Sequence, residues 1–357
     1  MKLLPTLHLF TVFLIAFPTC QLGNLSVYNN AKVIFHAIGP KFHSPELEGI
    51  DPSQSLEVME VTLGKFIEKN PDLPHEMRSR ILKIRKSIST AKARYLTCID
   101  LVKLATESNT EPSSVHEIAT QLSTDVQGQA DNESYPPTLF IGGHYRFNES
   151  GSLGGHTATY EVNRLANGKL GYFVNNTIKK DEYHESDENK IRQLVYPDLN
   201  TTDLEVIFWK NVIRKNFMTP KKEQKLMDSF YSYIDATLGK ATNNKMNGRS
   251  FNRQKVGVCA WKSISVWLHG QISPGIHRGN RNPSQELIYI RYKKLMFENM
   301  LANFNPDESF KATIRFEEDS HETISNEKVV LFLKSELERK IKKMDVKIKM
   351  MSVAMSS

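Results

Sequence analysis

The chain has 357 residues, with 47 Lys and Arg against 40 Asp and Glu, so its formal net charge is +7. A hydrophobic content of 39% and a charged content of 24% are typical of a folded protein, and they exclude wholesale disorder and a protein with many membrane spans. Three cysteines exclude a disulfide framework, and without a P-loop, a G-x-G-x-x-G motif or zinc-finger spacing we expect no cofactor, no metal and no nucleic-acid partner.

The amino terminus predicts an export signal. A short basic start is followed by an apolar run over residues 3–17, which is shorter than the roughly 20 residues of a bilayer span. We therefore expect residues 1–20 to be a secretory signal peptide, with an N-terminal membrane anchor or a lipid attached to Cys20 as alternatives. This predicts a secreted or membrane-anchored protein, with delivery into a host cell as one outcome and membrane contact through the N-terminal segment.

Residues 21–130 are expected to form a helical N-terminal region. Apolar side chains recur at three- and four-residue steps from Met77 to Val102, which places them on one face of a long helix. Cys98 lies near this face, so we interpret it as a buried core thiol. Frequent Ser, Thr, Asn, Asp and Pro over residues 108–137 predict a linker that contains one short helix at 115–122.

The periodicity changes at Thr138. Strands are expected at 138–147, 156–164 and 169–175, and Asn167-Gly168 predicts a two-residue hairpin between the last two, because both turn positions then need positive φ. Five further helices are expected, at 202–216, 221–238, 260–269, 285–303 and 325–343. Residues 135–303 are therefore predicted to form a domain of strands and helices, and residues 304–357 a helical basic C-terminal tail.

Cys259 is the candidate nucleophile. It comes just before the helix at 260–269, where backbone N–H groups and the helix dipole stabilise a thiolate. Gln254 is placed to donate a hydrogen bond to an oxyanion, and His156, after two glycines at a strand start, is placed to act as the base. The preceding loop adds positive potential through Lys245, Arg249, Arg253 and Lys255.

A catalytic histidine needs an orienting partner, and the hairpin register limits the choice. A two-residue turn places Asp181 diagonally across from His156, on the same face of the hairpin. Asn175 shares that face two residue pairs further along, and a β-bulge would bring Asn175 or Asn176 closer. The candidates for the orienting residue are therefore Asn175, Asn176 and Asp181.

The order His, Asn or Asp, Gln, Cys resembles the clan CE cysteine proteases. That clan includes the ubiquitin-like-protein proteases, the adenovirus-type proteases and the Yop-type effector acetyltransferases. Four stretches, at 138–144, 154–161, 172–177 and 254–263, are more closely similar to cysteine-protease-like proteins of intracellular bacteria such as chlamydiae and Legionella. The similarity covers roughly residues 138–303, under half of the chain.

The resemblance implies an α+β fold with a central mixed β-sheet flanked by helices. It implies that Cys259 is a nucleophile at a helix start, His156 the general base and Gln254 an oxyanion donor, while the polar position falls on Asn175 or Asn176. The implied activity is a cysteine peptidase that cleaves peptide or isopeptide bonds of a protein substrate, with ubiquitin or a ubiquitin-like protein as one substrate class. The alternatives are an effector acetyltransferase that uses the same cysteine and a non-enzymatic binding or scaffold protein in which Cys259 is inert.

Other polar clusters receive structural interpretations. His184 lies in an acidic stretch over residues 181–188, and without helical or His-x-His spacing we expect a solvated loop rather than a metal site. Lysines over residues 334–349 alternate with acidic residues, which predicts a solvated helix face, with contact to acidic lipid or nucleic acid as the minority interpretation. Trp261 and Trp267 are expected in the core.

Overall fold

The structure is a computed structural model that describes residues 25–39, 47, 49–104, 112–147, 153–176, 186–187, 190–218, 226–241, 250–252, 259–274, 282–304, 312–317, 320–324 and 326–356. The expected signal peptide lies outside these residues, as do Asp181, His184 and Gln254. Among the helices of the described part, none is both long enough and apolar enough to cross a membrane.

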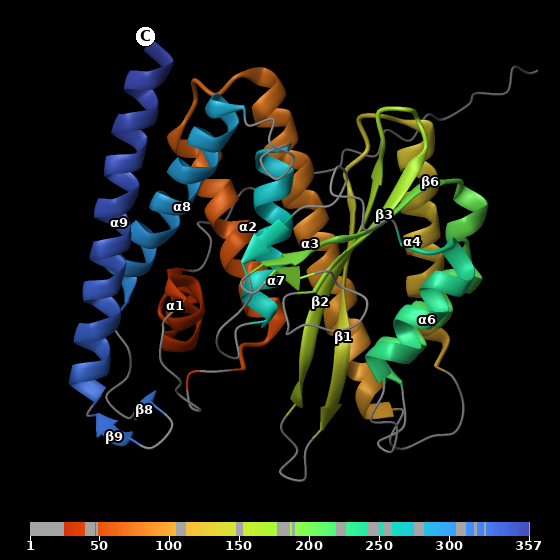
Figure 1. The fold of residues 1–357 in the computed structure, drawn as a ribbon, viewed down its shortest axis with the longest axis horizontal. Coiled ribbons are helices and arrows are strands. Elements are labelled where there is room, and N and C mark those ends of the chain that lie inside the picture. The colour runs from red at the N-terminus through yellow and green to blue at the C-terminus, as the bar shows by residue number, and fades with distance from the viewer. Residues whose placement is uncertain are drawn as a thin grey trace, which may run out of the picture.

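The fold is of the α+β class, and its elements alternate irregularly along the chain (Figure 1). The helices are α1 (Ala31–Ile38), α2 (Pro52–Lys69), α3 (His75–Leu104), α4 (Ser113–Asp131), α5 (Val206–Phe217), α6 (Leu226–Leu238), α7 (Cys259–Ile272), α8 (Pro283–Asn303) and α9 (Asn326–Ser356). Two 3₁₀ turns, η1 (Leu25–Tyr28) and η2 (Thr201–Leu204), add to these. The strands are β1 (Thr138–Phe147), β2 (Leu153–Arg164), β3 (Leu170–Asn175), β4 (Ser186–Asp187), β5 (Lys190–Arg192), β6 (Leu194–Leu199), β7 (Ser250–Asn252), β8 (Ala312–Glu317) and β9 (Ser320–Ile324).

The central sheet has the strand order β1-β2-β3-β6, and each neighbouring pair is antiparallel. The expected mixed sheet is therefore wrong for the described strands. The physical reason is the short connections: β1, β2 and β3 follow one another through hairpins, and parallel neighbours would need a crossover of a dozen residues or more. Two small sheets, β4-β5-β7 and β8-β9, are separate from the central one.

Helices cover both faces of the central sheet. Figure 1 shows α2, α7, α8 and α9 on one side of the sheet, and α4 and α6 on the other. Aromatic rings fill the space between the sheet and α5: Phe140 of β1 contacts Trp209 at 6.1 Å between ring centroids, and Tyr172 of β3 contacts Phe208 at 5.5 Å. Such pairs contribute about 1 kcal/mol each beyond the area that they bury.

The long amphipathic helix is confirmed. The apolar stripe of α3 is buried along its length: Met77, Ile81, Ile84, Ile88, Ala91, Tyr95 and Val102. Cys98 has no exposed surface, which confirms it as a core thiol, and burial raises its pKa well above the ordinary value. Trp261 and Trp267 are buried as expected.

The linker predicted for residues 108–137 is mostly wrong, because α4 occupies 19 residues of it. The buried face of α4 has Val115, Ile118, Leu122 and Val126 at helical spacing, whereas the hydroxyl and amide side chains that suggested a linker lie mostly on its outer face. The helix that begins at Cys259 also differs: it continues through the expected stop, Gly270, which is buried inside the helix.

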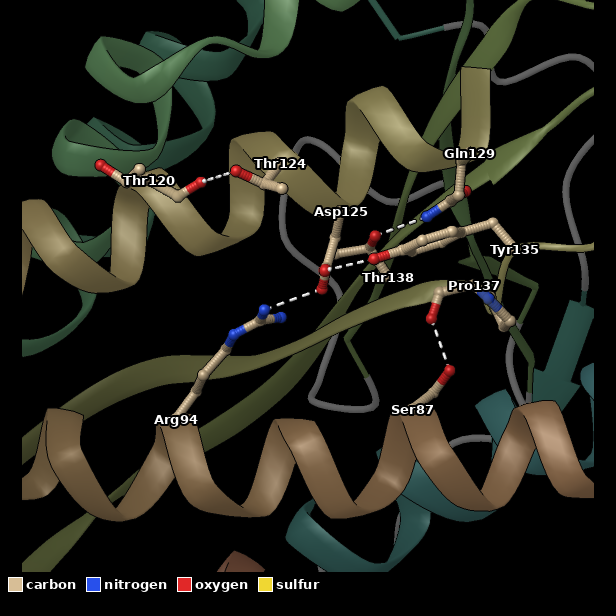
Figure 2. Close-up of polar contacts among 9 residues, drawn as sticks. All are labelled: Ser87, Arg94, Thr120, Thr124, Asp125, Gln129, Tyr135, Pro137 and Thr138. Carbon is tan, nitrogen blue, oxygen red and sulfur yellow. Dashed lines mark hydrogen bonds and ion pairs between the residues drawn. The ribbon is translucent and has the colours of Figure 1, made fainter. Parts of the chain in front are cut away.

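Polar contacts attach α4 to α3 and to the start of β1 (Figure 2). Arg94 of α3 forms an ion pair with Asp125 of α4 at 2.7 Å, and the Tyr135 hydroxyl donates to the same carboxylate at 3.0 Å. The Ser87 hydroxyl donates to the Pro137 carbonyl oxygen at 2.6 Å. Arg94 is buried, so these contacts compensate part of the cost of removing its charge from water. They hold the chain at the entry to β1 and thereby fix the edge of the sheet.

Candidate active site

The hairpin between β2 and β3 has a three-residue loop, not the expected two-residue turn. The Gly168 N–H donates to the Leu165 carbonyl oxygen at 3.0 Å, and the Leu165 N–H donates to the Lys169 carbonyl oxygen at 2.7 Å. Gly168 has φ of +80°, whereas Asn167 does not lie in the left-handed region, so this is a turn followed by a glycine bulge. The prediction of a two-residue turn is therefore wrong by one residue.

That one residue decides which asparagine shares a face with His156. In the observed register Asn175 is opposite Thr159, so its side chain lies on the face of β2 that alternates away from His156. The Asn175 amide donates to the Thr159 hydroxyl at 3.1 Å and accepts from Gln193 at 2.8 Å. Asn175 is fully buried and fixed in this position. It is a structural residue of the opposite face.

Asn176, the next residue, contacts His156. Its Oδ1 lies 2.7 Å from His156 Nε2, and its Nδ2 donates to the Tyr231 hydroxyl of α6 at 2.9 Å. An amide oxygen can only accept, so Nε2 carries the hydrogen and the imidazole lone pair is on Nδ1. Tyr231 and Asn176 are both buried, and together they fix the orientation of the histidine ring.

Cys259, the first residue of α7, lies against Thr157, the residue of β2 that follows His156. The backbone N–H and the hydroxyl of Thr157, and the N–H groups of Ala260 and of Cys259 itself, lie close enough to the sulfur to lower the pKa of the thiol. The Ser263 hydroxyl donates to the Thr157 carbonyl oxygen at 3.2 Å, which secures α7 on the strand. Cys259 of α7 thus lies next to Thr157, and the residue before Thr157 on β2, His156, contacts Asn176 at the end of β3.

The electrostatics at Cys259 differ from the expectation of a stabilised thiolate. Burial raises the pKa of the thiol, while the hydrogen bonds from Thr157 and from the first N–H groups of α7 lower it, and burial prevails. The helix terminus thus acts in the expected direction but does not dominate. A thiol with a raised pKa is protonated at neutral pH, so its reactivity depends on a base that removes the proton.

Several predicted site residues lie outside the described part of the chain. These are Asp181, Gln254 and the basic residues of the preceding loop, Lys245, Arg249, Arg253 and Lys255. Sequence reasoning did not identify Thr157 and Tyr231 as neighbours of the site. Thr157 could have been identified because it follows His156 in the sequence. Tyr231 is 75 positions away from His156, and nothing in the sequence around it indicates a place near the site.

A cavity among the described residues lies elsewhere. It has a volume of about 940 Å³, lies between α4 and α5, and its lining includes His116, Thr124, Glu205 and Lys210. It contains no thiol, and neither His156 nor Asn176 lines it. The described part of the chain also holds no group of three or more His, Cys, Asp or Glu side chains arranged for a metal ion.

Comparisons of the chain with protein-family models, with curated proteins and with solved structures found no match. The geometry around Cys259 is the basis for proposing a function.

Proposed function

We propose that this protein is a thiol hydrolase of the cysteine-peptidase type, with Cys259 as nucleophile, His156 as general base and Asn176 as the residue that orients it. The observation that carries the proposal is the 2.7 Å hydrogen bond between His156 Nε2 and Asn176 Oδ1. The residue that follows His156, Thr157, interacts with the Cys259 thiol. A thiol nucleophile, an imidazole base and a group that orients the imidazole are the parts that nucleophilic catalysis by cysteine uses.

The proposed reaction starts from a neutral thiol and a neutral imidazole. His156 Nδ1 takes the Sγ–H proton as the sulfur bonds to the carbonyl carbon of a peptide or isopeptide bond. The C–N bond breaks, the amine leaves with that proton, and a thioester remains. Water then attacks the thioester and gives a proton to Nδ1, the C–S bond breaks, and the sulfur takes the proton back.

Each neighbour has a defined task in this scheme. Asn176 holds the Nε2–H tautomer, so Nδ1 is the basic atom throughout. The N–H groups of Cys259 and Ala260 at the start of α7 lower the pKa of the thiol, and we assign them the stabilisation of negative charge next to the sulfur. From its spacing in the sequence, Gln254 is the proposed additional oxyanion donor.

The substrate and the fold family belong to the same proposal and are based on the resemblance to clan CE proteases, whereas the location is based on the apolar run over residues 3–17. On the basis of the resemblance the substrate is a protein, with ubiquitin or a ubiquitin-like protein as the class to test first. The protein is proposed to be exported through residues 1–20, as a cysteine-protease-like domain with helical segments before and after it. An acetyltransferase would use the same thioester chemistry with acetyl-CoA as the acyl donor.

One observation favours a second candidate function. Because burial keeps the pKa of Cys259 above its ordinary value, the thiol is unreactive unless His156 acts on it. A binding or scaffold protein with an inert Cys259 would have this same property. Thiol reactivity therefore discriminates between the two functions.

The test is covalent labelling of the purified full chain. Wild type, Cys259→Ala and His156→Ala are treated with iodoacetamide and with ubiquitin-like proteins that carry an electrophilic C-terminus, and adducts are located by mass spectrometry. We expect Cys259 to be alkylated at least about tenfold faster than the buried Cys98, and this advantage to disappear in His156→Ala because general-base help of this kind is typically worth about 10²-fold or more.

Each outcome has a definite meaning. A protein adduct that is absent from both variants supports a deconjugating peptidase and names the modifier. Fast alkylation without a protein adduct retains the thiol hydrolase and removes that substrate class. Equal rates at Cys259 and Cys98 would refute the catalytic proposal and leave the scaffold function.

A further inference from the structure

The last helix leaves an apolar face uncovered. α9 buries Val329 and Leu333 in its packing, whereas Val346, Met350 and Val353 are 60%, 67% and 63% exposed. Their spacing of four and three residues places them on one face over two turns of the helix. Figure 1 shows α9 at the edge of the molecule, with α8 on its inner side. Single exposed apolar residues are ordinary, but a continuous stripe on an outer helix indicates a surface that something covers.

The same half of α9 is strongly basic. From Arg339 to Ser356 it has six basic residues and one acidic residue, a net charge of +5. By helical spacing, Lys343 and Lys347 lie on one side of the apolar stripe, and Lys342 and Lys349 on the other. All four lysines are exposed. An apolar stripe with lysines along both edges is the pattern of a helix that lies in the plane of a membrane interface.

Partly buried lysines of α7, α8 and α9 lie close to one another beside this surface. Burial and the positive charges of Lys340, Lys262 and Lys347 lower the pKa of Lys293 in α8 to about 8. The pKa values of Lys262 in α7 and Lys340 in α9 are lowered as well, mainly by burial. Within the described part of the chain, no acidic side chain forms an ion pair with Lys262, Lys293 or Lys340. Glu286 near Lys293 and Glu336 near Lys340 offset part of this positive charge.

We propose that the outer face of α9, formed by Val346, Met350 and Val353 with the lysines beside them, docks the protein on an anionic lipid surface. The three aliphatic side chains enter the headgroup boundary, and the lysines extend their charged ends to the anionic headgroups. This function is independent of the chemistry proposed for Cys259 and uses a different part of the molecule.

Two other occupants fit the face less well. A second copy of the chain would bring two surfaces of charge +5 together, and their repulsion opposes association. Nucleic acid binds cationic and polar side chains through its phosphates and gives no reason for three exposed aliphatic residues in the centre of the face. An anionic bilayer satisfies both the charge and the apolar stripe.

The test measures partition of the full chain onto phosphatidylcholine vesicles with and without phosphatidylserine, by co-sedimentation. The charge variant combines Lys342→Gln, Lys343→Gln and Lys349→Gln. At about fivefold per lysine near an anionic surface, we expect its partition onto the mixed vesicles to fall on the order of 100-fold. The matched control removes the same charge elsewhere, through Lys69→Gln, Lys86→Gln and Lys240→Gln, which are exposed and distant from α9 in sequence.

A second variant tests the apolar stripe, with Val346→Ser, Met350→Ser and Val353→Ser. Its control replaces Leu82, Leu96 and Ile207, which are 48%, 48% and 61% exposed on α3 and α5, by Ser. We expect weaker binding only in the α9 variant. Because all of these residues are exposed, each variant retains its core, which circular dichroism verifies.

Binding to mixed vesicles that both α9 variants lose and both controls keep supports the proposal. Binding that is equal in all variants, as attachment through the apolar residues 3–17 would give, overturns it. So does a dimer in sedimentation that the stripe variant dissociates, or binding to a duplex oligonucleotide without binding to vesicles.

Discussion

At the scale of single residues, Cys259 shows two opposing effects on one thiol. The helix start and Thr157 supply hydrogen bonds that favour the thiolate, and burial favours the thiol by more. In the proposed mechanism the protonated thiol gains nucleophilicity when His156 takes its proton. A helix N-terminus indicates where a thiolate would be stabilised, but not whether that stabilisation exceeds desolvation.

His36 makes the stability of the fold sensitive to acid. It is buried in α1, its Nε2 donates to the Leu47 carbonyl oxygen at 3.0 Å, and burial lowers its pKa from 6.5 to about 4. The His36 side chain binds a proton more readily in the unfolded chain than in the folded one. The stabilisation that neutral His36 contributes to the fold is therefore complete above pH 6.5 and is lost as pH falls toward 4. We expect this loss to reduce the free energy of unfolding by about 2 kcal/mol between pH 7 and pH 5.

The measurement is urea denaturation at both pH values for wild type, His36→Gln and His116→Gln. Glutamine at position 36 keeps a donor for Leu47 but cannot take a proton, so this variant should lose about 2 kcal/mol less than wild type on acidification. His116 is exposed on α4, and its variant should behave as wild type. An equal loss in all three proteins would contradict this account of His36.

At the scale of elements, the length of the loop in the β2–β3 hairpin decides which asparagine contacts His156. A two-residue turn would have placed Asn175 on the face of His156, but the three-residue loop at Ala166–Gly168 places Asn176 there and turns Asn175 toward Thr159. The side-chain period of a strand is two, so a shift of one residue exchanges the two faces. The two neighbouring asparagines consequently have different roles.

This difference is testable with paired variants. Asn176→Ala should lower the rate of Cys259 alkylation at pH 7 by roughly tenfold or more, because the imidazole loses its fixed tautomer. Asn175→Ala should keep that rate and instead reduce the free energy of unfolding by about 1–3 kcal/mol, since Gln193 and Thr159 lose a buried partner. Alkylation kinetics and urea denaturation distinguish the two, and an inactive Asn175 variant with an active Asn176 variant would reverse the assignment.

At the scale of the whole molecule, the described elements share one contiguous core. It includes side chains from α1 and α3, from the central sheet and from α9, so helices at both ends of the chain are packed into the same interior as the candidate site. We expect cooperative unfolding of these elements in one transition, because removing any one layer exposes apolar surface of the next.

Two probes can measure this. Trp209, Trp261 and Trp267 report on α5 and α7 by fluorescence, whereas circular dichroism is dominated by all helices, including α1 to α4. Coincident urea transitions are the expected result. If the fluorescence transition preceded or followed the dichroism transition, residues 21–130 would form a unit that unfolds independently of the sheet.

Much of this protein could be predicted from the sequence by itself, because the signals are local. Helical spacing from Met77 to Val102 determined the buried face of α3, and β1 spans the predicted residues 138–147. The candidate thiol and imidazole followed from a cysteine at a helix start and a histidine after two glycines. Most of the polar α4, outside the predicted short helix at 115–122, was missed because its narrow apolar stripe is stabilised by packing against its neighbours rather than by its own composition.

Only the tertiary structure decided the remainder. The contact of Asn176 with His156 depends on a loop one residue longer than the Asn-Gly signal predicts, and the Tyr231 hydroxyl that fixes Asn176 comes from a helix distant in sequence. The pKa of Cys259 depends on how completely β2 and α7 exclude water. The spacing of residues along the chain predicts the local conformation of helices and strands. Strand register, the burial of side chains and contacts between residues distant in sequence are decided only when the elements pack together.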